Sequence, residues 1–187
     1  DQIVERLNQG YDTVYSTVSY SLSAHLEAIV LLGNANLDAT ANSMANRLTG
    51  NNANNTLTGL AGNDTYVFDR GWAWDTIVDK DSTINNVDVV LFGDGIAYDQ
   101  LWLRKSANNL ELSRIGTQDK LIIKDWYSSP VNHVEQFRTA DGHTLDHGKI
   151  AQLVQAMAMV SPPASNQTTL SSRQHRQLDS ILAASWS

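Results

Sequence analysis

The chain has 187 residues, 42% of them hydrophobic, which is enough to bury a core and excludes a purely disordered segment. Its 13 basic and 20 acidic side chains give a formal net charge of −7, which argues against a nucleic-acid partner and suits a divalent cation. Cysteine is absent, so disulfides cannot stabilise the fold.

The sequence shows neither a signal-peptide pattern in its first residues nor an apolar run long enough to span a membrane. The first ten residues are polar and lack the apolar core of a signal peptide. The longest apolar runs, such as residues 29–32, are too short to span a bilayer. Because the sequence opens in what reads as the middle of a strand, we expect it to be a fragment of a longer protein.

Strands are predicted first. Residues 13–20 and 27–32 are rich in β-branched and aromatic side chains, with Gly10 and Gly33 beside them. Between residues 41 and 67 the pattern changes to short polar segments rich in Asn and Gly, each followed by an apolar residue.

These segments form a repeat with a period of nine. Leu48, Leu57 and Tyr66 recur at that interval, and each follows an Asn or Asp two positions earlier. The last unit, residues 59–67, reads Gly-Leu-Ala-Gly-Asn-Asp-Thr-Tyr-Val and is close to the G-G-x-G-x-D-x-U-x repeat of calcium-binding β-helices. Six turn residues and three strand residues make half a coil of a flattened parallel helix, with Leu48, Leu57 and Tyr66 pointing inward.

The turns of such a coil alternate between its two sides, so a cation would lie between one turn and the next but one. This pairs residues 41–46 with 59–64, and residues 50–55 with 71–75. Converging carbonyls and a carboxylate supply the oxygens that calcium prefers. Asn46 and Asn55 stand where the repeat has Asp, so we expect few and weak sites. The alternative is that Asn, Asp and Gly serve only as turn formers.

Residues 69–145 read as a mostly β region. The acidic run from Asp69 to Asp81 is interpreted as a solvated turn in which only Asp75 has a functional role. The strand candidates are residues 76–78, 87–92, 101–104, 110–113, 121–124 and 134–138.

The C-terminal part changes character. Apolar residues at helical spacing follow Asp146, a plausible N-cap, and Pro162-Pro163 ends this helix. A polar linker at 161–172 leads to a second amphipathic segment. We therefore expect an all-β fold with three domains: a parallel β-roll (1–68), a β-rich capping domain (69–146) and a helical or flexible tail (147–187).

The repeats and their flanks resemble the RTX (repeats-in-toxin), or haemolysin-type calcium-binding, family. The resemblance covers most of the chain and includes motifs on both sides of the repeats. These are Gly10-Tyr11-Asp12-Thr13-Val14, Asn63-Asp64-Thr65-Tyr66-Val67-Phe68, Ile122-Ile123-Lys124-Asp125-Trp126-Tyr127 and Val134-Glu135-Gln136-Phe137-Arg138. Residues 149–187 are similar to the uncleaved C-terminal export signal of that family.

The resemblance implies a calcium-dependent folding and type I secretion module at the C-terminus of a large bacterial toxin or related exoprotein. Such a module leaves the cell through an ABC transporter that reads the tail, and it folds outside on calcium binding. The fragment itself is not expected to be an enzyme, because Gly-x-Ser-x-Gly and His-Glu-x-x-His motifs are missing; any catalytic domain would lie upstream. The five histidines share no ligand spacing.

Two other functions stay open. The first is a carbohydrate- or receptor-binding module of an RTX adhesin or of a secreted polysaccharide-modifying enzyme, with a glycan or host cell surface as its partner. Its contact face would contain Trp72, Trp74, Trp102, Trp126 and Tyr127. The second is that the chain is part of the enzyme itself, such as a lipase or protease.

The resemblance also implies ligands by position. The first calcium site would use the carbonyls of Asn42, Met44, Gly59 and Ala61 with the side chains of Asn46 and Asp64. The second would use the carbonyls of Asn51, Ala53 and Trp72 with the side chains of Asn55 and Asp75. Asp12 and Asp94 are further candidates.

Overall fold

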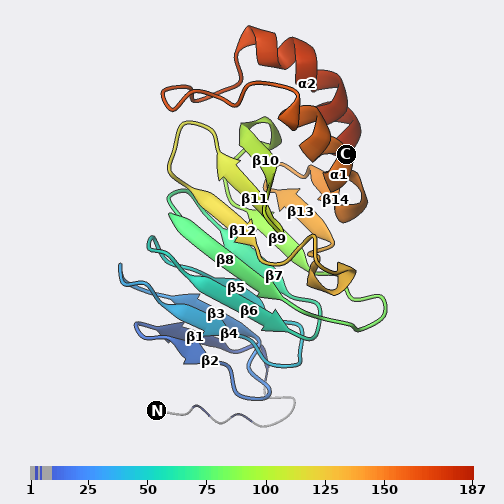
Figure 1. Cartoon of the computed structure of the whole chain (residues 1–187). Coiled ribbons are helices and arrows are strands. Elements are labelled where there is room, and N and C mark those ends of the chain that lie inside the picture. Colours follow the sequence, from blue (N-terminus) through green and yellow to red (C-terminus); the bar gives the residue numbers. More distant parts are fainter. Residues whose placement is uncertain (1–2, 4, 6–9) are drawn as a thin grey trace.

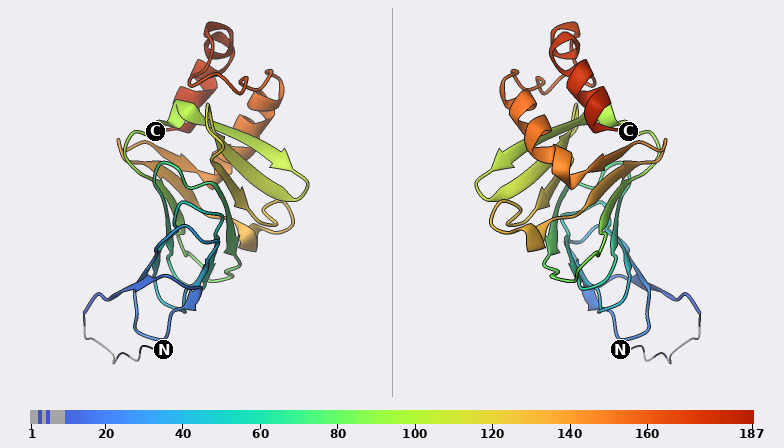
Figure 2. Two further views of the ribbon diagram at one scale, coloured as in Figure 1. Left: turned by 90° about the vertical axis from the view of Figure 1, so that its left-hand side faces the viewer. Right: turned by 90° about the vertical axis from the view of Figure 1, so that its right-hand side faces the viewer.

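The computed structural model describes residues 3, 5 and 10–187, and shows two seven-stranded sheets that face each other. The chain winds back and forth between the sheets as a flattened coil, and two helices cover the end opposite the first strands (Figures 1 and 2). The expected all-β, β-roll-like fold with a short helical C-terminal part is confirmed. In the described part of the chain, no helix is long and apolar enough to cross a membrane.

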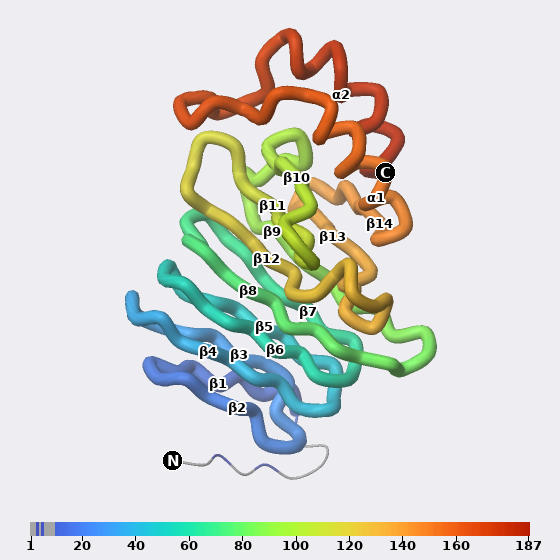
Figure 3. The backbone as a smooth tube through the Cα atoms, viewed as in Figure 1, coloured from blue at the N-terminus to red at the C-terminus, as the bar shows by residue number. Residues whose placement is uncertain are grey.

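Strands that follow each other in the sequence lie in opposite sheets as far as β9 (Figure 3). The first sheet has the order β1 (Thr13–Ser16), β3 (Ala28–Leu31), β5 (Arg47–Thr49), β7 (Thr65–Phe68), β9 (Val89–Phe92), β13 (Gln136–Thr139) and β14 (Thr144–Asp146). The second has the order β10 (Leu101–Ser106), β11 (Asn109–Arg114), β12 (Lys120–Ile123), β8 (Trp74–Asp79), β6 (Thr56–Leu60), β4 (Asp38–Thr40) and β2 (Tyr20–Ser21).

We call the parallel coil from β1 to β9 the roll, and the part from β10 onward the cap. Within the roll, neighbouring strands of each sheet are parallel, since a coil returns to the same sheet in the same direction. Antiparallel pairing enters at β10–β11–β12 and at β13–β14. Both sheets continue from the roll into the cap, through the parallel pairs β8–β12 and β9–β13. The division into three domains stays a prediction.

The repeat residues form the core of the roll. Leu48 pairs with Tyr66 in the first sheet, and Leu57 pairs with Ile77 in the second. All four side chains are 0% exposed. Because one unit cannot bury this apolar row alone, each coil depends on the coils beside it. The predicted inward stack is confirmed.

The predicted strand at residues 13–20 is two strands. β1 ends at Ser16, and the chain then turns so that Tyr20 begins β2 in the opposite sheet. The composition favours strand throughout, but a coil this flat must cross between sheets after four residues. The short strand β4 lacks any pattern that sequence reasoning could detect, because its three residues are Asp-Ala-Thr.

Two helices follow the last strand. α1 (His147–Ala158) begins after Asp146 at the N-cap position, as predicted, and buries Leu153 and Met157. α2 (Ser172–Ser185) begins with a capping box, in which the Ser171 hydroxyl accepts a hydrogen bond from the Gln174 N–H and the Gln174 side chain accepts one from the Ser171 N–H.

The final residues of the chain dock on the cap. The Thr144 N–H donates to the Ser187 carbonyl at 2.8 Å, and the Ser187 N–H donates to the Thr144 carbonyl at 3.0 Å. Trp186 is 3% exposed, and the Lys149 ammonium donates to the Ser185 carbonyl at 3.1 Å. The predicted tail, residues 147–187, contains two helices, and its last residues pack on the cap.

Candidate metal centre in the turns of the roll

The turns of the roll stack on each of its two sides. On one side, the Asn46 N–H donates to Asp64 Oδ1 at 2.8 Å. On the other, the Asn55 N–H donates to Asp75 Oδ1 at 2.7 Å. The predicted pairing of each turn with the next but one is therefore present in the structure.

Both aspartates are buried with one oxygen unused. Asp64 is 1% exposed and Asp75 is 0% exposed, and Oδ2 of each has no hydrogen-bond partner among the described residues. Burial raises the pKa of each carboxyl to about 8, although the N–H bonds from Asn46 and Asn55 act in the opposite direction. A buried carboxylate without a donor is costly, so each position requires either a proton or a cation.

Several main-chain carbonyls of the same turns accept no hydrogen bond from the described residues. Most of the carbonyls predicted as ligands accept no hydrogen bond from any residue that the structure describes; these are Asn42, Met44 and Ala61 on one side, and Asn51, Ala53 and Trp72 on the other. Gly62 has φ +112°, and a Cβ there would collide with the Met44 carbonyl, so glycine allows the two turns to approach. Gly59 lies in β6 against the Asp64 carboxylate.

The side-chain amides of Asn46 and Asn55 form hydrogen bonds within the protein through both their oxygen and their nitrogen. Asn46 Oδ1 accepts from the Asn42 N–H at 2.9 Å, and Asn46 Nδ2 donates to the Leu26 carbonyl at 2.8 Å. In the same way, Asn55 Oδ1 accepts from the Asn51 N–H at 2.7 Å, and its Nδ2 donates to the Leu37 carbonyl at 2.9 Å. Since a main-chain N–H must face oxygen, the orientation of each amide is fixed.

Asn42 and Asn51 extend this pattern. Asn42 Nδ2 donates at 2.8 Å to the carbonyls of both Ser23 and Leu26, and Asn51 Nδ2 donates at 2.9 Å to that of Ala35. In the two earliest turns, side-chain amide hydrogens therefore occupy main-chain carbonyls that could otherwise bind a cation. The prediction that Asn46 and Asn55 are side-chain ligands stays a prediction, because here their side chains bind the preceding turn.

The ligands predicted by position, which are main-chain carbonyls with the side-chain oxygens of Asp64, Asp75 and two asparagines, are of the kind that calcium prefers. Among the described residues, no three carboxylate or imidazole side chains already form a metal site, so carbonyls would have to supply most of the ligands. Of the further candidates, Asp12 has one buried oxygen without a partner and its N–H donates to Glu27 Oε2, whereas Asp94 is exposed.

Sequence reasoning missed two buried acids. Asp79 is 2% exposed and Asp88 is 1% exposed, so the acidic run is not a solvated turn throughout, and that interpretation is wrong for Asp79. Asp88 Oδ1 accepts from the Asp64 N–H at 2.7 Å, and the Asp88 N–H donates to Glu135 Oε2 at 2.8 Å. The series of bonds from a main-chain N–H to a side-chain oxygen of the next turn therefore continues into the cap. The alternation from Asp75 to Asp79 was the available signal, because it places both on the inward face of β8.

Comparison with known proteins gives evidence on the family of the chain that does not depend on the geometry of the turns. Residues 109–148 match the model of the haemolysin-type calcium binding protein related domain. A stretch of 94 residues, 49% of this chain, is 27% identical to the iron-regulated protein FrpA of Neisseria meningitidis serogroup C. Both matches support the RTX family. The matched stretch spans only 8% of that relative's length.

The family match lies in the cap, from β11 to the start of α1. It supports a calcium-binding protein of the RTX kind, while the positions of the ions rest on the geometry of the turns. The two observations are independent, because β11 and β12 contribute none of the predicted ligands.

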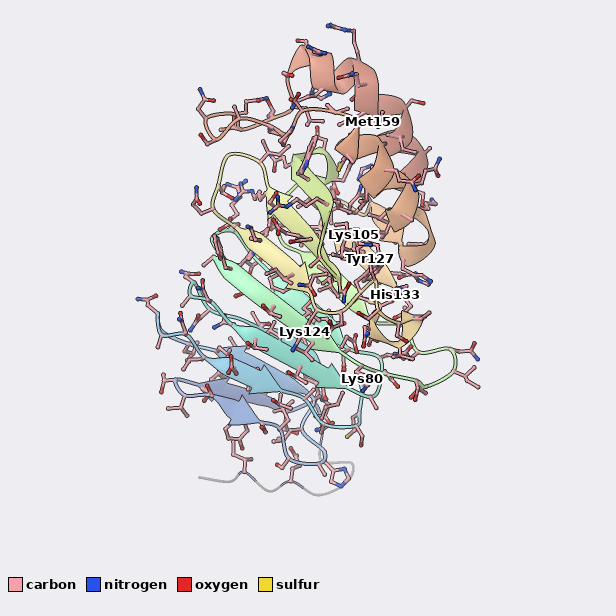
Figure 4. The ribbon with its side chains drawn as sticks, in the orientation of Figure 1. Lys80, Lys105, Lys124, Tyr127, His133 and Met159 are labelled. Atoms are coloured by element: carbon pink, nitrogen blue, oxygen red, sulfur yellow. The ribbon has the colours of Figure 1, made fainter. Side chains whose placement is uncertain are left out.

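The proposed aromatic contact face is largely buried. Trp72, Trp102 and Trp126 are 3%, 6% and 3% exposed, and Trp72 packs on Phe68 and Phe92 inside the molecule. Trp74 is 50% exposed beneath the Lys120 ammonium. Tyr127 lies beneath the Lys105 ammonium (Figure 4). These residues form no continuous aromatic face that a glycan could cover.

The first prediction concerns replacement of a side-chain amide in the turns, that of Asn55, by a carboxylate. The Asn55→Asp substitution removes the donor to the Leu37 carbonyl and adds a buried charge, so it should destabilise the calcium-free protein by about 1–3 kcal/mol. The free energy of unfolding is measured by urea titration in chelator. Asn54→Asp is the control, because Asn54 is exposed and its Oδ1 would still accept from the Trp74 N–H. Equal effects of the two substitutions would contradict a stabilising role for the hydrogen bonds of the Asn55 amide.

Proposed function

We propose that the chain is the calcium-dependent folding and secretion module of a larger secreted RTX protein. The observation that carries the proposal is the unused, buried oxygen of Asp64 and of Asp75, each on a carboxylate whose other oxygen already binds the adjoining turn. The ligands of one site come from segments that only the coil brings together. Calcium would therefore bind the folded form and not the unfolded chain.

Mass action then couples folding to calcium. One site contributes about 2.7 kcal/mol when the free ion exceeds its dissociation constant a hundredfold. Where calcium is scarce, the buried carboxylates have no partner of opposite charge, and the folded state loses this contribution. The module would remain unfolded inside the cell and fold where calcium is plentiful.

The tail would act before folding. In the folded protein Leu178, Leu182 and Trp186 are buried, so a transporter would recognise these residues only on the unfolded chain. Export with the tail first, followed by folding outside, would hinder return of the chain. The protein would thus be extracellular, and any catalytic activity would lie in a part of the parent protein outside this sequence.

Circular dichroism tests the coupling directly. In chelator at neutral pH, only part of the purified chain should be folded, so its β signal should be reduced, and millimolar calcium should restore it. Magnesium at the same concentration is the control for ionic strength, because it prefers six rigid ligands and retains its water. A full β signal in chelator, with an unfolding midpoint that calcium leaves unchanged, would contradict the proposal.

A further inference from the structure

A groove lies on the cap, where the end of α1 and the segment after it approach the outer face of β10, β11 and β12. Its volume is about 410 Å³, which is within the range of small-molecule sites. One wall is apolar and includes Met157 of α1 and Val160 of the following segment. The other wall consists of outward side chains of the sheet, and its polar members are Arg104, Glu111, Ser113 and Lys120.

A buried carboxylate organises the polar wall. The side chain of Glu111 is 7% exposed. Arg104 Nε donates to Glu111 Oε1 at 2.9 Å, and Arg104 Nη2 donates to Oε2 at 3.0 Å. The Lys120 ammonium is 3.2 Å from Glu111 Oε1 and lies 4.4 Å from the centre of the Trp74 ring. These contacts fix both cations before any ligand arrives, which lowers the cost of binding.

The groove carries more positive than negative charge. Glu111 is the one acid among its lining residues, and it faces both Arg104 and Lys120. The two cations keep further N–H donors, because Arg104 binds Glu111 through Nε and Nη2 and an ammonium has three hydrogens. The chain as a whole has a net charge of −7, so this positive excess is local. A partly enclosed groove strengthens such a field and favours an anionic ligand.

The apolar wall limits what can carry the anion. A ligand in this groove must present an apolar surface to Met157 and Val160 and hydrogen-bonding groups to the opposite wall. A sugar ring that bears a carboxylate meets both requirements, because its C–H face is apolar and its edge carries hydroxyls. The carboxylate and hydroxyls would then face the donors of Arg104 and Lys120 and the hydroxyl of Ser113.

A peptide strand is a poorer fit at this place. β10 is an edge strand of the second sheet, but its Leu103 N–H already donates to Met157 Sδ at 3.1 Å. α1 therefore occupies the edge to which an added strand would pair. Recognition must rely on side chains, and here it relies on charged groups rather than on the continuous aromatic face that the protein lacks.

We propose that the groove between α1 and strands β10–β12 binds a carboxylated sugar of an acidic polysaccharide, with Arg104 and Lys120 as its donors. The apolar wall packs against the sugar ring, and Glu111 holds the two cations in position. All residues that line the groove belong to the cap, so the inference does not rest on the calcium ligands of the roll. It gives the protein a second role, which is attachment to an acidic polysaccharide.

Isothermal titration calorimetry of the full chain in excess calcium tests the site. The probe is a linear tetramer of galacturonic acid, and we expect it to bind. A galactose tetramer of the same linkage lacks the carboxylates, and octanoate lacks the sugar; each should bind at least about tenfold more weakly. Absence of binding by the acidic tetramer, or equal binding by either control compound, would overturn the inference.

A matched pair of variants locates the site. Lys120→Gln removes a donor from the groove, whereas Lys124→Gln removes the same charge from an exposed position just after β12 and outside the groove (Figure 4). We expect Lys120→Gln to weaken binding by about tenfold or more, because a charge-assisted hydrogen bond is lost. Lys124→Gln should weaken it by about twofold at most, since salt screens the more distant charge. Equal losses would indicate unspecific attraction and would contradict the site.

A second pair adds charge without touching the network of Glu111. Ala158→Glu places an acid in the groove from an exposed position, and Met159→Glu places it on the next residue, which is 85% exposed and does not line the groove. We expect loss of binding in Ala158→Glu alone, so this pair decides the matter if Lys120→Gln does not fold. Full binding by Ala158→Glu would overturn the inference.

The outcomes separate this inference from the proposed function. A chain that folds and binds the acidic tetramer equally well in chelator would contradict the proposed function and leave the inference intact. A chain that folds only in calcium but does not bind the tetramer would overturn the inference alone.

Discussion

In chelator, the free energy of unfolding should fall as the pH is raised from 5 to 8. Asp64 and Asp75 have a pKa of about 8 in the folded protein, against 3.8 for an ordinary aspartate. A pKa raised by folding means that the folded state binds protons more tightly, so the resulting stability is complete below pH 4 and is lost as the pH rises through 8. Asp79, with a pKa of about 9, acts in the same direction.

The size of this effect is large. Each aspartate that is protonated in the folded chain and ionised in the unfolded chain lowers stability by about 1.4 kcal/mol per pH unit. Urea titrations at pH 5, 6.5 and 8 measure the slope, and Asp75→Asn should reduce it by the contribution of one group. In calcium the slope should reverse, because metal binding requires ionised carboxylates. Stability that rises with pH in chelator would contradict the buried, unpartnered state of these acids.

The Trp186→Ala substitution should lower the free energy of unfolding by about 3–5 kcal/mol, because it empties a packed site. Trp186 is 3% exposed, its ring centroid is 5.9 Å from that of Tyr98, and it forms a β-bridge with Leu145. Urea unfolding in calcium is the measurement. Met159→Ala is the control, because Met159 is 85% exposed and its replacement should change stability by less than about 0.5 kcal/mol.

A loss below about 1 kcal/mol for Trp186→Ala would mean that the tail contributes little to the fold. The expected larger loss would mean that the end of the chain is part of the folded cap, and under the proposed export function the same residues would then serve two states of the protein. They would be accessible in the unfolded chain and part of the cap after folding. A substitution there could then reduce export and stability separately, and the two effects need separate assays.

The regular part of this fold could be predicted because its interactions repeat. The interval between Leu48, Leu57 and Tyr66 determines both the inward row and the pairing of turns, and the structure has both. The start of α1 after Asp146 was equally accessible, since helical spacing and an N-cap are local signals.

The chemistry of individual side chains could not be predicted in the same way. The amide of Asn42 binds carbonyls 16 and 19 residues earlier in the chain, and only the stacked coil brings them together. Asp79 ends a strand in an acidic run that suggests solvent, and its burial depends on the opposite sheet. Trp186 is buried by β14 and Tyr98, which no local pattern near the C-terminus indicates.

The two kinds of turn give the coil a direction. Near the cap, Asp64 and Asp75 each leave a buried oxygen that only a proton or an ion could satisfy, whereas the coils nearer the N-terminus are joined by neutral amides. Under the proposed tail-first export, the end of the coil that contains Asp64 and Asp75 would meet external calcium first and would nucleate folding. Each later coil can add to that nucleus through amide hydrogen bonds alone. Growth of the solenoid after the first step would therefore be insensitive to the concentration of the ion that started it.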